Sequence, residues 1–184
     1  MKNDLDSLMQ SYNFDGLLVV GAGDHNPAMM YLTGGGHFGG ELVKKRGVQS
    51  LLFCRMMERD EAAKTGLPTK LIDDYKPLEL LKQADGDVLK ATVRRYQMML
   101  DECGLSTGRV AVYGRTELGA MYSILSEVQA SMPGLTFVGE VGNTMLMEAQ
   151  LTKDASEAAR IRKMGLITTA VVGQVADFLT SHKV

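Results

Sequence analysis

Near the C-terminus of the chain, apolar residues recur every three or four positions over roughly thirty residues. The segment starts at Lys153, and Asp154 and Ser156 are both candidates to cap its first turn. Its apolar positions are Ala158, Ile161, Met164, Val172, Val175 and Leu179. The spacing predicts an amphipathic helix of about 28 residues, about 42 Å long. Because no Gly or Pro follows Leu179, we expect this exit helix to lead into a further domain.

The rest of the chain alternates between short apolar runs and amphipathic segments. Apolar runs predict strands at residues 17–20, 48–54, 69–72, 109–113 and 135–138. Amphipathic spacing predicts helices at residues 5–12, 27–32 and 57–64, one that begins at Pro77, and two at residues 87–102 and 116–132. Asn3 or Asp4 is expected to cap the first helix, and Thr116 the last. This alternation indicates an α/β fold, with a mixed, mainly parallel sheet flanked by helices on both faces.

Two neighbouring segments complete this pattern. Residues 34–40 contain five glycines, a density that favours a loop, either a mobile connection or a lid. Residues 41–46 follow as a candidate edge strand, because Lys and Arg on an edge discourage pairing between sheets.

Charge argues against a nucleic-acid partner. The formal net charge is −2, which offers no overall attraction to phosphates. Short basic clusters at residues 44–46 and 94–95 are expected to be solvated surface, as is the acidic group of Glu58, Asp60 and Glu61.

The sequence also carries indications of its compartment. It contains no uninterrupted run of eighteen apolar residues and no apolar segment at the N-terminus, so we expect neither a membrane span nor a signal peptide. Cys54 and Cys103 are far apart and outside any CxxC motif. Free thiols in a reducing cytoplasm are the simplest interpretation, and the predicted location is cytoplasmic.

Candidate chemistry is sparse. No nucleophile elbow, zinc-peptidase helix or phosphate-binding loop motif is present, and we assign no catalytic residue. Residues 21–23 (GAG) follow a strand as a dinucleotide fingerprint would, but its third glycine is missing, so a turn is the better interpretation.

The histidines near the glycine loop are the remaining candidates for a site. His25 and His37 flank Tyr31, and Asp24 lies beside His25. Two His and one Asp are zinc ligand types, but their spacing matches no template, so no metal site is predicted. Backbone N–H groups of residues 34–40 are an alternative anion-binding nest.

Two segments resemble the N-terminal domain of the pita-bread metallopeptidases, the group of aminopeptidase P, prolidase and creatinase. Residues 15–20 (DGLLVV) followed by residues 31–34 (YLTG) resemble its apolar strand and turn. Residues 151–153, Glu157 and residues 161–163 are similar to the junction into the family's catalytic domain. The resemblance implies a creatinase/prolidase-type N-terminal domain at residues 1–150 and a junction helix at residues 151–184.

The resemblance also implies what the chain lacks. In the family, two divalent metal ions (Mn, Co or Zn) are held by two Asp, one His and two Glu of the C-terminal domain, and no segment here matches that set. The parent would be a metal-dependent Xaa-Pro peptidase, and the chain alone is expected to be inactive, without cofactor. One departure is that the family often has Asn three residues before the Tyr, whereas Asn26 lies five before Tyr31.

The family's front domain helps to form dimers and narrows access to the active site. By analogy, His25, Tyr31, His37 and Phe38 are expected on the rim of a neighbouring cleft, although a packed Tyr31 with a hydrogen-bonded hydroxyl is an alternative. We expect a homodimer and a catalytic domain in cis. The competing hypothesis is a self-standing module that binds a small ligand or assembles with others.

Overall fold

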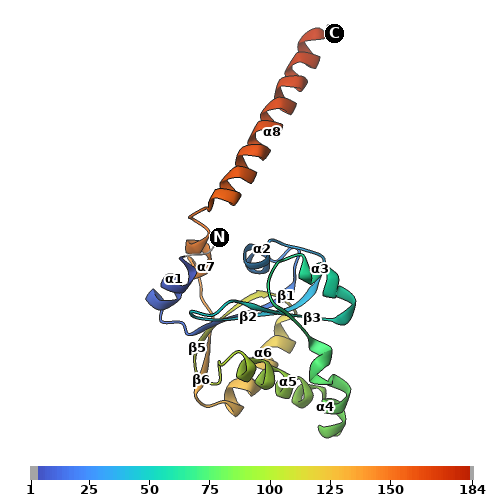
Figure 1. Ribbon diagram of the computed structural model, residues 1–184, viewed down its shortest axis with the longest axis vertical. Helices are drawn as coiled ribbons and strands as arrows, with labels where there is room; N and C mark the ends of the chain where they lie inside the picture. Colours follow the sequence, from blue (N-terminus) through green and yellow to red (C-terminus); the bar gives the residue numbers. More distant parts are fainter. Residues whose placement is uncertain (1–3, 183–184) are drawn as a thin grey trace.

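The computed structural model describes residues 4–182, which form a six-stranded sheet covered by helices, with one long helix projecting from it (Figure 1). The strands are β1 (Gly16–Ala22), β2 (Gly39–Lys45), β3 (Leu51–Cys54), β4 (Thr69–Leu71), β5 (Gly108–Arg115) and β6 (Leu135–Val138). The α-helices are α1 (Leu5–Ser11), α2 (Pro27–Thr33), α3 (Arg59–Ala63), α4 (Pro77–Gln83), α5 (Val88–Glu102), α6 (Leu118–Ser131), α7 (Met145–Ala149) and α8 (Ala155–Ser181). Two 3₁₀ turns are η1 (Met56–Glu58) and η2 (Ile72–Tyr75).

The sheet order is β4-β3-β2-β1-β5-β6. β2 pairs antiparallel with β1 and β3, whereas the β1–β5, β3–β4 and β5–β6 pairs are parallel. All strands except β2 therefore run in the same direction within the described sheet. The predicted α/β class with a mixed, mainly parallel sheet is confirmed.

The position of β2 corrects the prediction of an edge strand, since it lies between β1 and β3. Lys44 is buried there, and its Nζ lies 2.7 Å from Asp6 Oδ1 and donates to the Val48 carbonyl at 2.9 Å. Arg46 NH2 lies 3.1 Å from Asp15 Oδ1. The basic cluster is thus partly internal, because acidic partners from distant segments neutralise it.

The predicted glycine loop is shorter than expected, because Gly39 and Gly40 belong to β2. Gly40 lies opposite both Gly21 and Cys54 in the sheet. A Cβ atom at Gly40 would lie 1.9 Å from the Phe53 carbonyl oxygen, so no larger residue fits this approach of two backbones.

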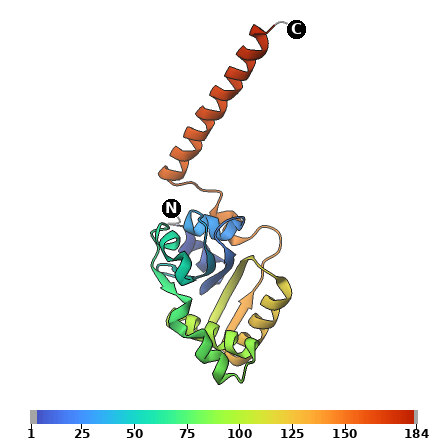
Figure 2. The same cartoon turned by 90° about the vertical axis from the view of Figure 1, so that its right-hand side faces the viewer.

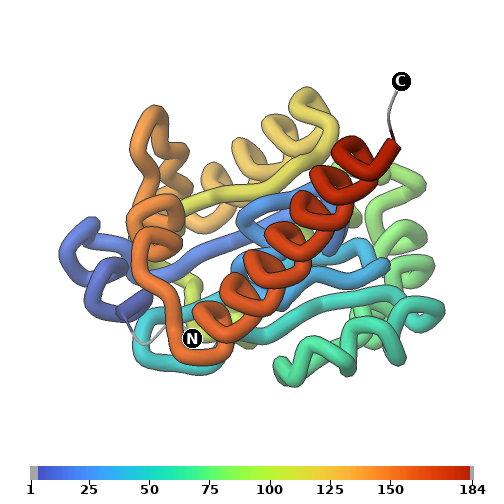
Figure 3. The backbone as a smooth tube through the Cα atoms, turned by 90° about the horizontal axis from the view of Figure 1, so that it is seen from above, coloured from blue at the N-terminus to red at the C-terminus, as the bar shows by residue number. Residues whose placement is uncertain are grey.

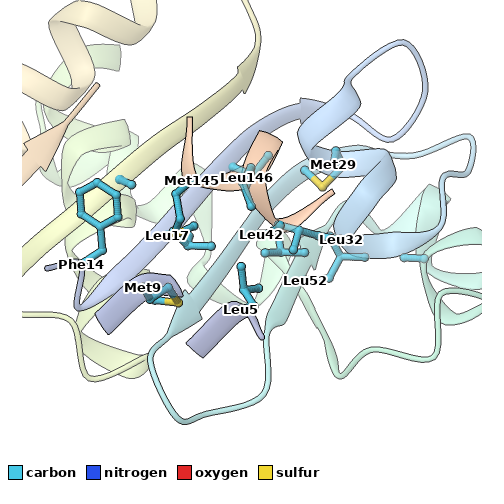
Figure 4. Close-up of a cluster of buried hydrophobic side chains, with 14 of the residues drawn as sticks. Leu5, Met9, Phe14, Leu17, Met29, Leu32, Leu42, Leu52, Met145 and Leu146 are labelled. Atoms are coloured by element: carbon cyan, nitrogen blue, oxygen red, sulfur yellow. The ribbon is translucent and has the colours of Figure 1, made fainter. Parts of the chain in front are cut away.

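Two hydrophobic clusters sandwich the sheet. Successive β1 residues alternate between them: Leu17 and Val19 face the first cluster, Leu18 and Val20 the second. Helices α1, α2, α3 and α7 cover the first face and α4, α5 and α6 the second (Figures 1 and 2). Figure 4 shows the first cluster, in which residues from α1, α2 and α7 meet over β1, β2 and β3.

Helix α7 and the cap of α6 were not predicted from the sequence, whereas Asp4 was one of the two candidates for α1. Only five residues long, α7 has no detectable periodicity, yet Met145, Leu146 and Ala149 are buried. Glu117, rather than Thr116, caps α6 by accepting hydrogen bonds from two backbone N–H groups. Asp4 occupies the N-cap position of α1, and Asn3 lies outside the described residues.

The predicted exit helix is present as α8, 27 residues long. Asp154 caps it in a reciprocal capping box: its Oδ1 accepts from Glu157 N at 2.8 Å, and Glu157 Oε2 accepts from Asp154 N at 3.0 Å. No described residue of α8 is buried. Figure 3 looks along the molecule from the α8 side, and the side views show α8 extending beyond the body (Figures 1 and 2).

By length and composition, α8 is a candidate membrane span. Its most apolar 18-residue window has a mean hydropathy of 1.2, and none of that window is buried. The expectation of no span rested on the lack of an uninterrupted apolar run, whereas α8 reaches this hydropathy with Thr, Gly and Gln among its apolar residues. One such helix is weak evidence for a membrane location, because helices that dock on protein surfaces share this composition.

Candidate functional site

A cleft of about 620 Å³ lies at the carboxyl edge of the parallel strands. Ala22 at the end of β1, Arg55 after β3, Ile72 after β4 and Thr116 after β5 all line it. From β1 the chain builds the sheet outwards in one direction through β2, β3 and β4, and then returns to the other side of β1 to add β5 and β6, so the strand order reverses between β1 and β5. Ligands of open α/β sheets bind outside the carboxyl ends of strands at such points, so this cleft is the leading candidate site.

A buried ion pair forms one wall of the cleft. Arg95 NH2 of α5 donates to Glu41 Oε1 of β2 at 2.9 Å, and the Tyr96 hydroxyl donates to the same oxygen at 3.0 Å. The Glu41 and Arg95 side chains are only 10% and 14% exposed. Burial opposes the charge on Arg95, but the adjacent Glu41 carboxylate outweighs it and raises the pKa of Arg95. Burial first, and then Glu41, raise the pKa of Tyr96.

The second oxygen of Glu41 has no such partner. Among the described residues, the buried side-chain atoms without a hydrogen bond are Glu41 Oε2 and Glu58 Oε2, and both residues line the cleft. The sequence analysis placed Glu58 and Arg95 on solvated surfaces. That prediction is wrong, because Glu58 Oε2 and most of the Arg95 side chain are buried. The alternation of side chains along β2 could have indicated that Glu41 is buried, because it places Glu41 on the same face as the buried Val43.

The residues predicted for a rim do not line this cleft: His25, His37 and Phe38 lie on loops beside α2, and Tyr31 lies within α2. His25 is exposed and has a positive φ of 50°, and its carbonyl accepts from Arg115 NH1 at 2.9 Å. His37, whose side chain is 88% exposed, lies with Nδ1 3.6 Å from Asp24 Oδ2. Phe38 is 3% exposed and packs into the first cluster. The structure therefore brings His37 to Asp24, while Phe38 anchors the loop from inside.

Tyr31 is partly buried and its hydroxyl is hydrogen-bonded, which is the alternative interpretation from the sequence. Its hydroxyl donates to the Ala149 carbonyl at 3.0 Å, which ties α2 to α7 just before α8 begins. Burial, followed by the charges of Glu157, Asp4 and Asp154, raises the pKa of Tyr31.

Residues 21–23 correct the predicted turn, because Gly21 and Ala22 are the last two residues of β1 and only Gly23 follows the strand. Gly21 has a φ of 108°, and a Cβ there would lie 2.1 Å from the Arg115 carbonyl oxygen. A Cβ at Gly23 would lie 2.6 Å from the Gly36 carbonyl oxygen. Asn26, which the sequence singled out only by its spacing from Tyr31, is fully buried. Its Nδ2 donates to the Val20 carbonyl at 2.9 Å, and its Oδ1 accepts from Met29 N at 3.3 Å and caps α2.

A metal ion is typically held in a protein by a cluster of His, Cys, Asp or Glu side chains. Within residues 4–182, no group of three or more His, Cys, Asp or Glu side chains is arranged to hold one.

The sequence matches no protein-family model, and no curated protein matches it. Solved structures do share the fold. A dipeptidase from Pyrococcus horikoshii OT3 is 16% identical, with a TM-score of 0.61 over 95% of this chain and 43% of that chain. An X-Pro aminopeptidase from Thermotoga maritima MSB8 is 12% identical, with a TM-score of 0.54 over 86% of this chain and 38% of that one.

A third structure, the N-terminal domain of an Xaa-Pro dipeptidase from Lactobacillus brevis, is 12% identical, with a TM-score of 0.47 over 81% of this chain and 97% of that chain. The first two likenesses confirm the fold expected from the sequence, that of the pita-bread N-terminal domain. The chain spans less than half the length of those two structures.

Proposed function

We propose that this chain acts as the non-catalytic N-terminal domain of an Xaa-Pro metallopeptidase, where it promotes homodimer formation and narrows access to the active site. The observation that carries the proposal is the shared fold: it extends over 95% of this chain but only 43% of the P. horikoshii dipeptidase. In this role, the two divalent ions and the hydrolytic step belong to a catalytic domain in cis.

The exposed helix α8 supports a docking role. Its apolar stripe, which includes Ile161, Val172, Val175 and Leu179, is exposed along its length. Burying each such side chain contributes about 1.5–3 kcal/mol, so an uncovered stripe favours association. In the proposed arrangement, the catalytic domain or a second copy of the chain covers it.

The loops beside α2 suit the control of access. Exposed His25 and His37 stand on loops that the buried Phe38 and Asn26 hold in place, so exposed polar groups rest on a packed base. These loops lie on the same side of the sheet as α7, from which the chain enters α8 (Figure 1). From that position, the loops could form part of the rim of a cleft in a domain that packs along α8.

The reading frame beyond the last codon of this chain provides the direct test. An open frame that encodes the Asp, Asp, His, Glu, Glu ligand pattern is expected, and a stop codon would contradict the proposal. In a second assay, the chain alone is incubated with Xaa-Pro dipeptides and manganese or cobalt. No turnover above the buffer blank is expected, and chelator-sensitive turnover would contradict the non-catalytic assignment.

Association through α8 is tested by charge substitution. Val172→Glu with Val175→Glu places two carboxylates in the apolar stripe and is expected to shift the chain from dimer to monomer in light scattering. The matched control, Ala170→Glu with Gln174→Glu, adds the same charges on the opposite side of the helix, given about 100° per residue. A wild-type chain that stays monomeric, or equal effects of both pairs, would refute this interface.

The alternative, a self-standing small-ligand-binding module, has one observation in its favour. The cleft at the carboxyl edge of the sheet lies within this chain and is lined by its own charged groups. Such a site needs no second domain.

A further inference from the structure

The cleft contains two carboxylate oxygens without hydrogen bonds. Glu41 is 8% exposed, and its Oε2 is buried and unpartnered within the described residues, as is Glu58 Oε2. Leaving a buried polar group unsatisfied costs about 1–3 kcal/mol, and more when the group is charged. Folded proteins satisfy nearly all such groups, so two of them in one cleft point to a partner that is not part of the chain.

From these oxygens, we propose that the cleft binds a small organic cation, whose guanidinium or primary ammonium group donates hydrogen bonds to Glu41 and Glu58. Ionised carboxylates only accept hydrogen bonds, so the missing partner must be a donor. Charge-assisted bonds of this kind are the strongest that such a group makes. The inference does not depend on the proposed role in a peptidase.

The charges of the wall favour a cation over an anion. Three carboxylates (Glu41, Glu58 and Asp73) and two guanidinium groups (Arg55 and Arg95) line the cleft, for a formal net charge of −1. Arg95 is already engaged by Glu41 and lies 4.7 Å from the centre of the Tyr96 ring. That leaves two carboxylates facing one arginine, and an anionic ligand would meet this excess of like charge.

The first carboxylate is held in place. Glu41 Oε1 accepts from both Arg95 and Tyr96, which fixes the carboxylate and leaves Oε2 as its free acceptor. A group positioned in this way loses little entropy on binding.

The floor of the cleft provides space for a ligand. Gly21, Gly39 and Gly40 line it without side chains, and its volume of about 620 Å³ suits a small molecule. A Cβ atom at Gly39 would contact Glu58 Oε1 at 3.7 Å and no other atom within 4 Å. A side chain at Gly39 would therefore occupy the cleft without disturbing the sheet.

The test uses the full chain labelled with nitrogen-15 and agmatine, a short chain with a guanidinium group at one end and an ammonium group at the other. Amide resonances of Gly21, Gly39 and Gly40 are followed up to about 20 mM probe, which saturates even a millimolar site. Saturable shifts are expected with agmatine, and none with glutarate or 1,5-pentanediol, an anionic and a neutral compound of similar length.

Two substitutions and two controls locate the site. Glu41→Gln keeps the Oε1 acceptor but is expected to weaken agmatine binding at least about tenfold, the loss of one charge-assisted bond. Gly39→Val is expected to abolish binding by filling the cleft. Glu61→Gln on the surface of α3 and Gly139→Val, where a Cβ meets no atom within 4 Å, should leave binding unchanged.

Circular dichroism confirms that each variant is folded, and Gly39→Val keeps the test valid if Glu41→Gln is too unstable to measure. Agmatine that shifts no cleft amide would overturn the proposal, and so would equal binding of glutarate. Unchanged affinity in a folded Glu41→Gln or Gly39→Val chain would do the same.

Discussion

Replacing Arg95 by Met should destabilise the fold more than any conservative surface change. The substitution keeps the packing of the arginine stem near Tyr96 and Met99 but removes the charge that pairs with Glu41 at 2.9 Å. Because the Glu41 carboxylate is 10% exposed, it would remain buried and unpaired. Breaking a buried pair in this way costs about 3–5 kcal/mol in the free energy of unfolding.

Two further variants separate the charge from the packing. Glu41→Gln should cost about 1–2 kcal/mol, since its amide oxygen still accepts from Arg95 and Tyr96. The double variant Glu41→Gln/Arg95→Met should be more stable than the sum of the single effects by at least about 1 kcal/mol, because no buried charge is left without a partner.

Urea unfolding followed by far-ultraviolet circular dichroism measures these effects, since the chain contains no Trp. The variants are best made together with Val172→Glu and Val175→Glu, so that the proposed association through α8 does not contribute. The matched control is Arg94→Met, because the neighbouring Arg94 is exposed and bonds only to Gln97 in the described structure; it should change stability by less than about 0.5 kcal/mol. Equal effects of Arg94→Met and Arg95→Met would refute the reasoning.

Three other predictions concern separate parts of the fold. Asn26→Ala should cost about 2–3 kcal/mol in urea unfolding, because it removes the α2 cap and the bond to a buried carbonyl, whereas exposed Asn143→Ala should cost little. The hydrogen bonds from Lys70 and then Tyr75 lower the pKa of Glu102, so the stabilisation from this carboxylate is present above the ordinary Glu pKa and is lost as pH falls through the lowered value. Glu102→Gln should therefore reduce the loss of stability on acidification, measured by urea unfolding at a series of pH values, and an unchanged pH dependence would contradict this prediction. Amide exchange should be fast at residues 36–37 and slower at Gly34, whose N–H donates to the Met30 carbonyl at 2.8 Å, and protection at both 36 and 37 would contradict a mobile loop.

Local sequence determined most of the secondary structure. Residues 135–138 form a strand as predicted, and α8 begins at the cap that Asp154 and Glu157 specify. Pro27 opens α2 at its first position, as its fixed φ favours. These features depend on the periodicity of side chains and on residues within one turn of each other, and both are visible in the chain alone.

Tertiary structure decided the position of β2 and the composition of the cleft. The antiparallel pairing of β2 with β1 and β3 places basic Lys44 inside, where Asp6 neutralises it. Glu41 and Arg95 lie 54 positions apart, and neither has a distinguishing neighbour in sequence. Such contacts arise because packing two helical layers onto a sheet buries charges that must then find partners, and that pairing is set by the whole fold rather than by any local segment.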